Sequence, residues 1–329
     1  MVPNFLDESR RIVLVAEAIP KPNSVDLLAN DLEQMGEKTR DKLTATIKEL
    51  GREVVVYSTP QEFQKQLAKH ENDLVLAPWS GKGSQNRLAL MPAICEAAGI
   101  DYIGSDASTR SICNDKEISK LIARNLGFSA PRSVRLLPGD GFDLIDQLDR
   151  PVIVKPCSEG TSIGIGPNSV CQDIREVQEQ VALLHQNGFE HVLVEEFIKG
   201  KEVCICLMGN VKEPLYAGAI ELSLAEDPEY LQTNPYDARI KKGFYGTRTL
   251  TAISDDILAA DIDRAKKAFN YFSRIQLFRV DGRLDAAGKF WFIEFATLPT
   301  FWPLSELTIG LSSHFDDYRD FISEVLRLR

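Results

Sequence analysis

The residues best suited to chemistry lie where an apolar run ends in a lysine and opens into a loop of small residues. Val152–Val154 predict a buried strand, and the loop after Lys155 covers residues 156–166. Glycine and small residues let backbone N–H groups approach an anion closely, and a lysine offers a point charge for a phosphate. The Gly-Lys-Ser/Thr ending of a P-loop is missing. The stretch fits a phosphate-binding loop, but an ordinary strand and turn with a surface lysine fits it equally well.

Two carboxylates stand among apolar neighbours near the C-terminal end. Asp281 lies in residues 278–285 and Glu294 in residues 290–296, and these runs predict two antiparallel strands joined by a turn. A carboxylate inside a strand core is costly unless it is paired or bound to a metal. Mg²⁺ accepts carboxylate oxygens together with phosphates, so the pair suits that ion. Arg279 is the alternative ionic partner, and we favour the metal because a phosphate loop lies upstream.

A nucleotide base could lie beside residues 191–202. These residues predict a strand and a turn, and a second strand, Val203–Met208, follows, so that the two strands would be linked as a hairpin. Strand edges offer N–H and C=O groups to the polar rim of a flat base. Glu195 and Glu202 could accept hydrogen bonds from an exocyclic amine and a ribose. The alternative is that these acidic residues at strand ends are merely solvated.

Three further segments lie near these motifs. Lys116 falls in the first turn of a helix capped by Asn114 or Asp115, where a cation opposes the helix dipole, which favours a phosphate role only weakly. Residues 79–85 follow a predicted strand and are either a ligand loop or a flexible surface loop. Residues 227–249 are polar with little periodicity, which is typical of a lid or of disorder. The helix after Lys116 carries Ile118, Leu121, Ile122 and Leu126.

The elements that must position these motifs begin with alternating strands and helices in residues 1–107. Continuous apolar runs predict strands buried on both faces, as in a parallel sheet. This alternation predicts an α/β fold with a doubly wound parallel sheet. The predicted strands are Ile12–Ala16, Val54–Val56, Leu74–Ala77 and Tyr102–Ile103, and the helices between them cover Leu28–Leu50, Phe63–Leu67 and Leu88–Ala98.

Composition narrows the class of protein. The 329 residues are enough for two or three structural units. With 44% hydrophobic and 26% charged residues the chain has an ordinary globular composition, and its net charge of −10 argues against general nucleic-acid binding. The six dispersed cysteines are typical of reduced core residues in a cytosolic protein. We expect a cytoplasmic protein without a membrane partner, because the sequence has no signal-type segment and no run long enough to span a membrane.

Taken in chain order, the motifs resemble those of a known family. They are Asp-Lys at 115–116, Val-Lys-Pro at 154–156, Glu-Gly-Thr-Ser at 159–162, Val-Glu-Glu-Phe-Ile-x-Gly-x-Glu at 194–202 and Arg-Val-Asp at 279–281, followed by Glu-x-x-Thr-x-Pro at 294–299. This collinear set is similar to that of ATP-grasp ligases of the D-alanine–D-alanine ligase type, over roughly residues 72–306. The resemblance implies an ATP-grasp fold in which two α+β subdomains clamp ATP. It divides the chain into a Rossmann-like N-terminal domain (1–107), a small subdomain with the phosphate loop (108–198), and a C-terminal subdomain with a lid loop and a metal site (199–329).

The resemblance also implies ATP as a cofactor and assigns residues to it. Lys116 and Lys155 would hold the phosphates. Thr161, assigned to the nucleotide site, and Ser162, assigned to catalysis, stand where the family has two serines near the first substrate. Adenine and ribose would be bound by Glu195, by the backbone of Glu196 and Ile198, and by Glu202.

Metal binding, catalysis and substrate binding are implied in the same way. Asp281 and Glu294 would bind Mg²⁺. Lys241 would lie on the lid near the γ-phosphate, and Arg279 with the backbone N–H of Thr300 would form an oxyanion site. The remaining substrate positions are Ser305, for the carboxylate of the second substrate, and Glu17, near the place of the family's substrate-binding glutamate.

The departures from the family pattern concern the substrates more than ATP. Ala296 stands where the family has an asparagine that binds a second Mg²⁺, and Thr300 replaces a glycine in the oxyanion turn. Residues 16–20 replace a Gly-Gly signature, and the loop 82–85 lacks the family's carboxylate. Lys242 occupies the place of a lid tyrosine. We therefore expect ATP-dependent ligation of substrates other than those of cell-wall D-Ala-D-Ala synthesis.

The sequence thus predicts an ATP-dependent carboxylate–amine ligase that joins two small amino-acid-type substrates through an acylphosphate, as a homodimer without a nucleic-acid partner. A non-catalytic ATP-binding regulatory protein is a second interpretation, for which Ala296 is the best argument. Retention of Arg279, Asp281 and Glu294 together argues against that loss of catalysis. The residues also leave open an ATP-grasp enzyme with another acceptor, and an α/β binding protein that needs no nucleotide.

Overall fold

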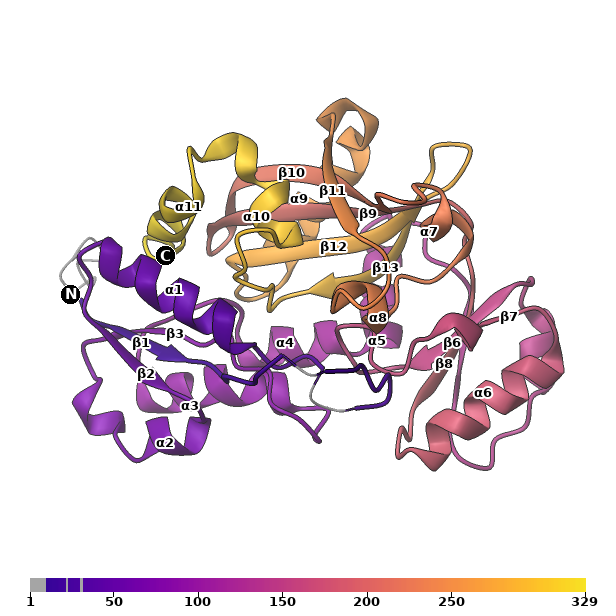
Figure 1. The fold of residues 1–329 in the computed structure, drawn as a ribbon, viewed down its shortest axis with the longest axis horizontal. Coiled ribbons are helices and arrows are strands. Elements are labelled where there is room, and N and C mark those ends of the chain that lie inside the picture. The colour runs from indigo at the N-terminus through magenta and orange to yellow at the C-terminus, as the bar shows by residue number, and fades with distance from the viewer. Residues whose placement is uncertain (1–9, 22, 30–31) are drawn as a thin grey trace.

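Three sheets carry the fold of the computed structural model, which describes residues 10–21, 23–29 and 32–329 (Figure 1). The first sheet has the order β2-β1-β3-β4 with parallel pairings, so the predicted parallel sheet is confirmed. Its elements are β1 (Ile12–Val15), α1 (Glu37–Glu49), β2 (Val54–Tyr57), α2 (Pro60–Gln64), β3 (Leu74–Leu76), α3 (Leu90–Ala98) and β4 (Tyr102–Ile103).

Strand β1 is buried on both faces, as its continuous apolar run predicts. Ile12 and Leu14 share a core with Leu43 of α1. Val13 and Val15 point the other way and share a core with residues of α2 and α3. Because side chains alternate along a strand, this division shows that helices cover both faces of the sheet.

The second sheet is antiparallel and has the order β5-β8-β6-β7. One helix covers it, through Val177, Val181 and Leu184. This part of the chain lies at the right of Figure 1, where α6 flanks β6 and β8. Its elements are β5 (Ser133–Leu136), β6 (Val152–Pro156), β7 (Val170–Cys171), α6 (Ile174–Gln186) and β8 (Val192–Glu196).

The third sheet is also antiparallel and has the order β11-β10-β9-β12-β13. Residues of β9 alternate between two cores: Ile205 packs with Phe269 of the covering helix, whereas Met208 packs with Leu307 and Phe321 on the other face. The elements are β9 (Lys201–Asn210), β10 (Glu213–Leu224), β11 (Arg248–Ile253), α9 (Ala259–Tyr271), β12 (Leu277–Leu284), β13 (Phe290–Ala296), α10 (Glu306–Gly310) and α11 (Tyr318–Val325).

Two helices link the first sheet to the other two. They are α4 (Ala107–Asn114) and α5 (Lys116–Asn125), and residues from both belong to the core that α9 shares with β9. Asp106 caps α4 and Asp115 caps α5, each by accepting a backbone N–H. The three domain boundaries inferred from the resemblance remain a prediction. Among the described residues, no helix is both long and apolar enough to span a bilayer.

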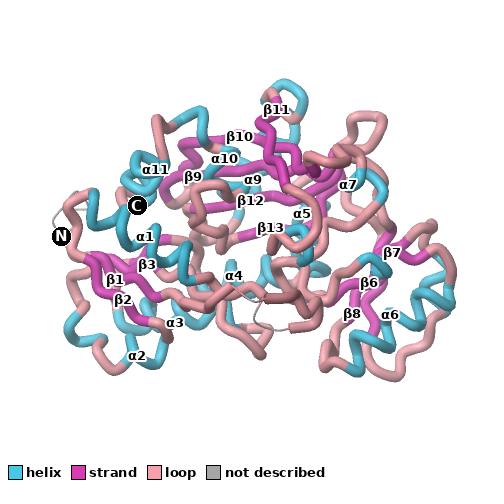
Figure 2. The backbone as a smooth tube through the Cα atoms, in the orientation of Figure 1, coloured by secondary structure: helices cyan, strands magenta, loops and turns pink. Residues whose placement is uncertain are grey.

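Four details differ from the sequence-based expectations. The helix expected from Leu28 begins only at Glu37, and the chain between β1 and α1 is largely loop (Figure 2). Strands β8 and β9 are not a hairpin, because they belong to different sheets. Ile118 and Leu121 of α5 are exposed, whereas Ile122 and Leu126 pack against a core, so only part of its apolar stripe is buried. Strand β10, an interior strand of the third sheet, was not anticipated.

The segment 227–249 is packed against the body of the protein. It contains α7 (Tyr230–Thr233) and α8 (Ala238–Lys241) and ends at the start of β11. Leu231, Tyr236 and Ile240 are buried in the core below the third sheet. We call residues 227–249 the lid segment.

The packing of α1 can be tested by a matched pair of leucine variants. Leu43 is fully buried in α1, so Leu43→Ala should lower the free energy of unfolding by about 2–5 kcal/mol. Leu121 in α5 is 60% exposed, so Leu121→Ala should change it by no more than about 0.5 kcal/mol. Urea unfolding of both variants measures the difference. Equal losses would contradict the placement of α1 on the first sheet.

Candidate active site

Two cavities meet in the space between the three sheets. The inner cavity is lined from β6, β8, β9, β12 and β13. The outer cavity is lined from residues 19–21 and 32–39, the loop after β3 and residues 295–306. The outer cavity measures about 600 Å³ and the inner one about 90 Å³. Ligand pockets commonly measure about 300–1,000 Å³, so the outer cavity has room for a ligand as it stands, whereas the inner cavity must widen to admit one. Six side chains line both cavities, and we call them the junction: Lys116, Glu159, Lys241, Arg279, Glu294 and Glu306.

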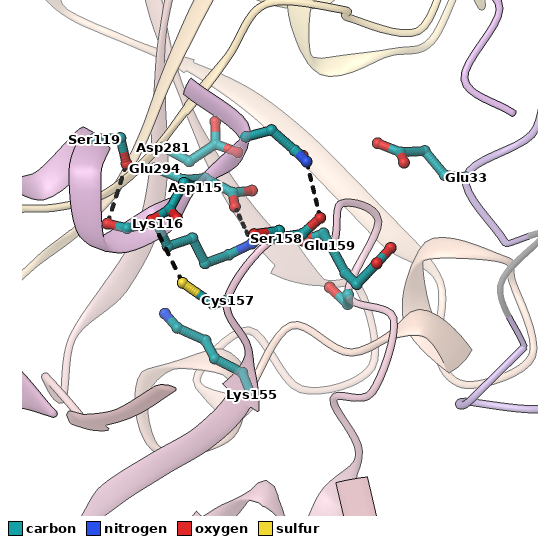
Figure 3. A network of polar contacts seen from close by, with 12 residues as sticks. Glu33, Asp115, Lys116, Ser119, Lys155, Cys157, Ser158, Glu159, Asp281 and Glu294 are labelled. Carbon is teal, nitrogen blue, oxygen red and sulfur yellow. Dashed lines mark hydrogen bonds and ion pairs between the residues drawn. The ribbon is translucent and has the colours of Figure 1, made fainter. Parts of the chain in front are cut away.

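The predicted phosphate-binding loop, residues 156–166, follows Lys155 of β6 and faces the start of α5 (Figure 3); we call it the phosphate loop. Nζ of Lys116 donates a hydrogen bond to the backbone carbonyl of Glu159 and lies 3.1 Å from Oε2 of Glu294. Thr161 and Ser162 have φ angles of 49° and 57°, a left-handed backbone that is rare for a β-branched residue such as Thr161. Strained loops of this kind cluster at functional sites, and their N–H groups can form a concavity for an anion.

A buried carboxylate between two lysines lies at the inner end of the site. Nζ of Lys155 donates to Oε1 of Glu195 at 2.7 Å, and Lys120 forms an ion pair with the other oxygen. Burial raises the pKa of Glu195, but the two lysines outweigh that effect and lower it. Burial lowers the pKa of Lys120 to about 8, against the attraction of Glu195. Glu195 is therefore held as an anion that keeps both lysines in place.

Asp281 and Glu294 lie directly opposite each other on β12 and β13. Arg279 donates two hydrogen bonds to Asp281, at 2.5 and 2.7 Å, so it is the ionic partner of this carboxylate in the structure. Burial raises the pKa of Glu294, but attraction from Lys116 and Lys241 outweighs it and brings the pKa to about 2. Glu294 is thus ionised at neutral pH.

Whether this carboxylate pair could bind a divalent cation depends on how many oxygen ligands the protein itself supplies. Within the described residues, no group of three His, Cys, Asp or Glu side chains is arranged to hold a metal. Mg²⁺ commonly uses one or two protein carboxylates and takes its other ligands from water and phosphates. Asp281 and Glu294, which line the inner cavity beside the phosphate loop, fit that requirement, and the assignment stays a prediction.

Three more of the residues predicted to bind the nucleotide line the inner cavity: Glu196, Ile198 and Glu202. Glu202 lies 3.2 Å from Arg283 on the adjacent strand. Burial raises the pKa of Glu202, and the charges of Arg283 and Lys241 act against that rise. Because β8 and β9 belong to different sheets, a ligand here would lie between two sheets and not on one hairpin.

The lid segment touches the phosphate loop. Ser162 Oγ donates a hydrogen bond to the backbone carbonyl of Tyr236 at 2.6 Å. Nζ of Lys241 lies 4.9 Å from the centre of the Tyr236 ring, within range of a cation–π contact. This packing brings Lys241 to the junction and accounts for the small size of the inner cavity.

The residues predicted to bind substrates divide between two places. Thr300 and Ser305 line the outer cavity, and so does Thr161, which the resemblance assigns to the nucleotide site. Glu17 does not belong to either lining, because its Oε1 accepts hydrogen bonds from the backbone N–H groups of Ser80 and Gly81, at 3.1 and 2.6 Å. Burial raises the pKa of Glu17. Its visible role is to hold the loop after β3 against the site.

Sequence reasoning missed Glu306, which lies at the centre of the junction. Its Oε1 lies 2.7 Å from Arg248 and its Oε2 lies 3.2 Å from Arg279. Burial raises the pKa of Glu306, but the two arginines outweigh it and bring the pKa to about 2. An acidic residue in the first turn of a helix is ordinary, so nothing marked it out in the sequence.

Two other charged groups were missed. Lys120 lies four residues after Lys116 on the same face of α5, a spacing that could have drawn attention to it. Buried Arg87 bridges Glu33, at 2.5 Å, and Glu159, at 2.9 Å. Burial raises the pKa of Glu159, and Arg87 counteracts it. Figure 3 shows Glu33 approaching the phosphate loop from a separate segment of the chain.

The ion pairs of Glu306 should make stability depend on pH in the acid range. Its folded-state pKa of about 2 lies below the ordinary value of 4.5, so these pairs stabilise the protein fully above about pH 4.5 and lose their effect as the pH falls toward 2. Glu306→Gln should therefore be less stable than the wild-type protein at about pH 6, and the difference should shrink toward about pH 3. Urea unfolding across this range measures it. A difference that stayed constant with pH would contradict the paired carboxylate.

Comparison with known proteins adds to this geometry. The family model described as "D-ala D-ala ligase C-terminus" matches residues 142–327. The D-alanine–D-alanine ligase of Aquifex aeolicus is 25% identical over 291 residues, which cover 88% of this chain and 94% of that protein.

Solved structures share the fold. A D-alanine–D-alanine ligase of Bacillus anthracis complexed with ATP superposes with a TM-score of 0.72 at 21% identity, covering 97% of this chain and 95% of that one. The VanG D-Ala:D-Ser ligase of Enterococcus faecalis has a TM-score of 0.70 at 17% identity, covering 98% and 99%. At these identities the likeness establishes the fold alone.

Proposed function

This chain belongs to the D-alanine–D-alanine ligase family of ATP-grasp ligases, and we propose that it joins two small amino-acid-type substrates other than two D-alanines. One observation carries the proposal: the inner and outer cavities meet at a junction of charged side chains beside the phosphate loop. A nucleotide in the inner cavity would direct its terminal phosphate to substrates in the outer one.

The nucleotide site is proposed from residues that line the inner cavity. Lys155 and Lys116 would hold phosphates, and backbone N–H groups would come from Ser162 and from Thr161, which lines the outer cavity. The adenosine part would contact Glu195, Glu196, Ile198 and Glu202. The lid segment would lift to admit the nucleotide, since the inner cavity is small when Ser162 holds Tyr236.

The proposed reaction activates a carboxylate by phosphorylation and then transfers the acyl group to an amine. Mg²⁺, when bound by Asp281 and Glu294, would offset charge on the phosphates. Lys116 and Lys241 lie at the junction, where they would stabilise the transferred group. In the second step Arg279 and the backbone N–H of Thr300 would stabilise the oxyanion, at about 3 kcal/mol per donor in studied enzymes.

Three features support substrates other than two D-alanines. The outer cavity, at about 600 Å³, has far more room than two three-carbon amino acids fill. Large side chains, those of Phe244 and Trp302, line it together with Lys21. Lys242 and Thr300, which depart from the family pattern, also lie in this wall. A homodimer remains part of the proposal without further support.

The first test is release of ADP and phosphate from MgATP with amino acids supplied singly and in pairs, D-alanine included, followed by mass spectrometry. We expect release that requires two substrates and yields a new amide mass. Efficient release with D-alanine alone and a D-Ala-D-Ala product would overturn the proposed specificity. MgATP binding without release, for every pair in a panel of varied carboxylates and amines, would favour the non-catalytic interpretation that Ala296 supports.

The metal assignment predicts the effect of a single substitution. Glu294→Gln should lower amide formation by about 1,000-fold or more, because loss of Mg²⁺ stabilisation costs several kcal/mol in the transition state. Glu221→Gln is the matched control, since Glu221 forms a 2.9 Å ion pair with Lys201 on the same sheet and lines neither cavity. Steady-state amide formation measures both. Full activity of Glu294→Gln would show that the metal assignment is wrong.

A further inference from the structure

Glu306 connects the lid segment with the arginine proposed to bind the oxyanion. We propose that Glu306 is a positioning residue that orients Arg279 for acyl transfer once the lid segment is packed down. The inference rests on the proposed ligase function. It assigns a role to a side chain that the sequence motifs do not include.

The first step of the argument is that Arg279 is fixed from two sides. Its Nε and one terminal nitrogen donate to Asp281 at 2.5 and 2.7 Å, and the other terminal nitrogen donates to Glu306 at 3.2 Å. A guanidinium has its donors in a rigid plane, so two carboxylates at different edges define its orientation. With Asp281 alone, the plane could pivot about that one pair.

The second step is that Glu306 also holds the lid segment. Oε1 of Glu306 accepts a hydrogen bond from Arg248 at 2.7 Å and another from the hydroxyl of Tyr236 at 3.4 Å. Arg248 also donates to the Tyr236 hydroxyl at 3.0 Å and to the backbone carbonyl of Leu304 at 2.9 Å. Tyr236 lies within the lid segment and Arg248 near its end, so one carboxylate receives contacts from two parts of it.

The third step concerns the electrostatic cost of this carboxylate. Glu306 lines both cavities, in the space where phosphates and a substrate carboxylate are proposed to bind. A buried anion there repels those ligands unless cations neutralise it. Arg248 and Arg279 provide that neutralisation. Arg248 begins β11, where it pairs with Leu224 of β10, and its hydrogen bond to the hydroxyl of Tyr236 ties the neutralised carboxylate to the lid segment. With the lid segment packed down, Arg279 therefore has its second partner held in place and free of competing repulsion.

The experiment begins with wild-type protein and a substrate pair that gives an amide. Failure at this stage would count against the proposed function and not against the role of Glu306. In Glu306→Gln we expect amide formation to fall on the order of 100-fold, as for a misplaced catalytic group, while KM for MgATP stays within about threefold. ADP release should fall less than amide formation, because the acylphosphate forms and is then lost to water. Glu306→Asp should recover part of the amide yield.

Two further measurements separate positioning from a general structural effect. Trypsin should cleave after Arg239, Lys241 and Lys242 faster in Glu306→Gln than in the wild-type protein, with a non-hydrolysable ATP analogue bound. Arg248→Gln should show the same excess of ADP over amide, and the double variant should be no worse than Glu306→Gln alone. If Glu306→Gln does not fold, Arg248→Gln still tests the proposal, because it removes the contact between Glu306 and the lid segment from the other side.

Glu324→Gln is the matched control, because Glu324 accepts a hydrogen bond from the hydroxyl of Tyr216 at 3.1 Å and lines neither cavity. It should keep the wild-type ratio of amide to ADP and the wild-type rate of cleavage. An unchanged ratio in both Glu306→Gln and Arg248→Gln would overturn the proposal. So would equal losses of ADP and amide with an unchanged rate of tryptic cleavage.

Discussion

The need to balance buried charge governs the whole arrangement. The junction places three cations and three carboxylates in one small space, and each must find a partner because an unpaired buried charge is costly. Their backbones belong to α5, the phosphate loop, the lid segment, β12, β13 and α10. No single sheet could supply these charges. The pairing therefore links the second and third sheets, through α5 and the lid segment, into one site.

Patterns of local sequence predicted the parts of this site that lie within one element or one hairpin. The buried run of β1 and the parallel order around it follow from continuous apolar residues. A short turn joins β12 to β13 and sets their register, and a one-residue shift between Asp281 and Gly282 then brings Asp281 opposite Glu294. Most residues proposed for the nucleotide line the inner cavity, because their motifs lie on β6, β8, β9 and the start of α5, which converge there, whereas Thr161 lines the outer cavity.

The other parts of the fold and of the site depend on tertiary contacts that the periodicity of the sequence does not encode. The apolar pattern of α5 predicted its buried face only in part, because the helix turns Lys116 and Lys120 inward to a charged site and leaves Leu121 in solvent. Strands β8 and β9 are adjacent in sequence yet belong to different sheets, a choice made by long-range pairing with β6 and β12. Glu306 looks like an ordinary helix-start residue until the lid segment, some sixty residues earlier, is seen to pack on it.

The division of the lining between the two cavities has an evolutionary consequence. Within the described part of the chain, no residue before Lys116 lines the inner cavity, whereas residues 19–21 and 32–39 form a wall of the outer one. Apart from Glu33, which reaches the phosphate loop through Arg87, substitutions in that N-terminal stretch would alter which molecules are selected without changing the groups around the nucleotide. A lineage built on this scaffold can thus diversify its products while its energy-coupling half is inherited unchanged.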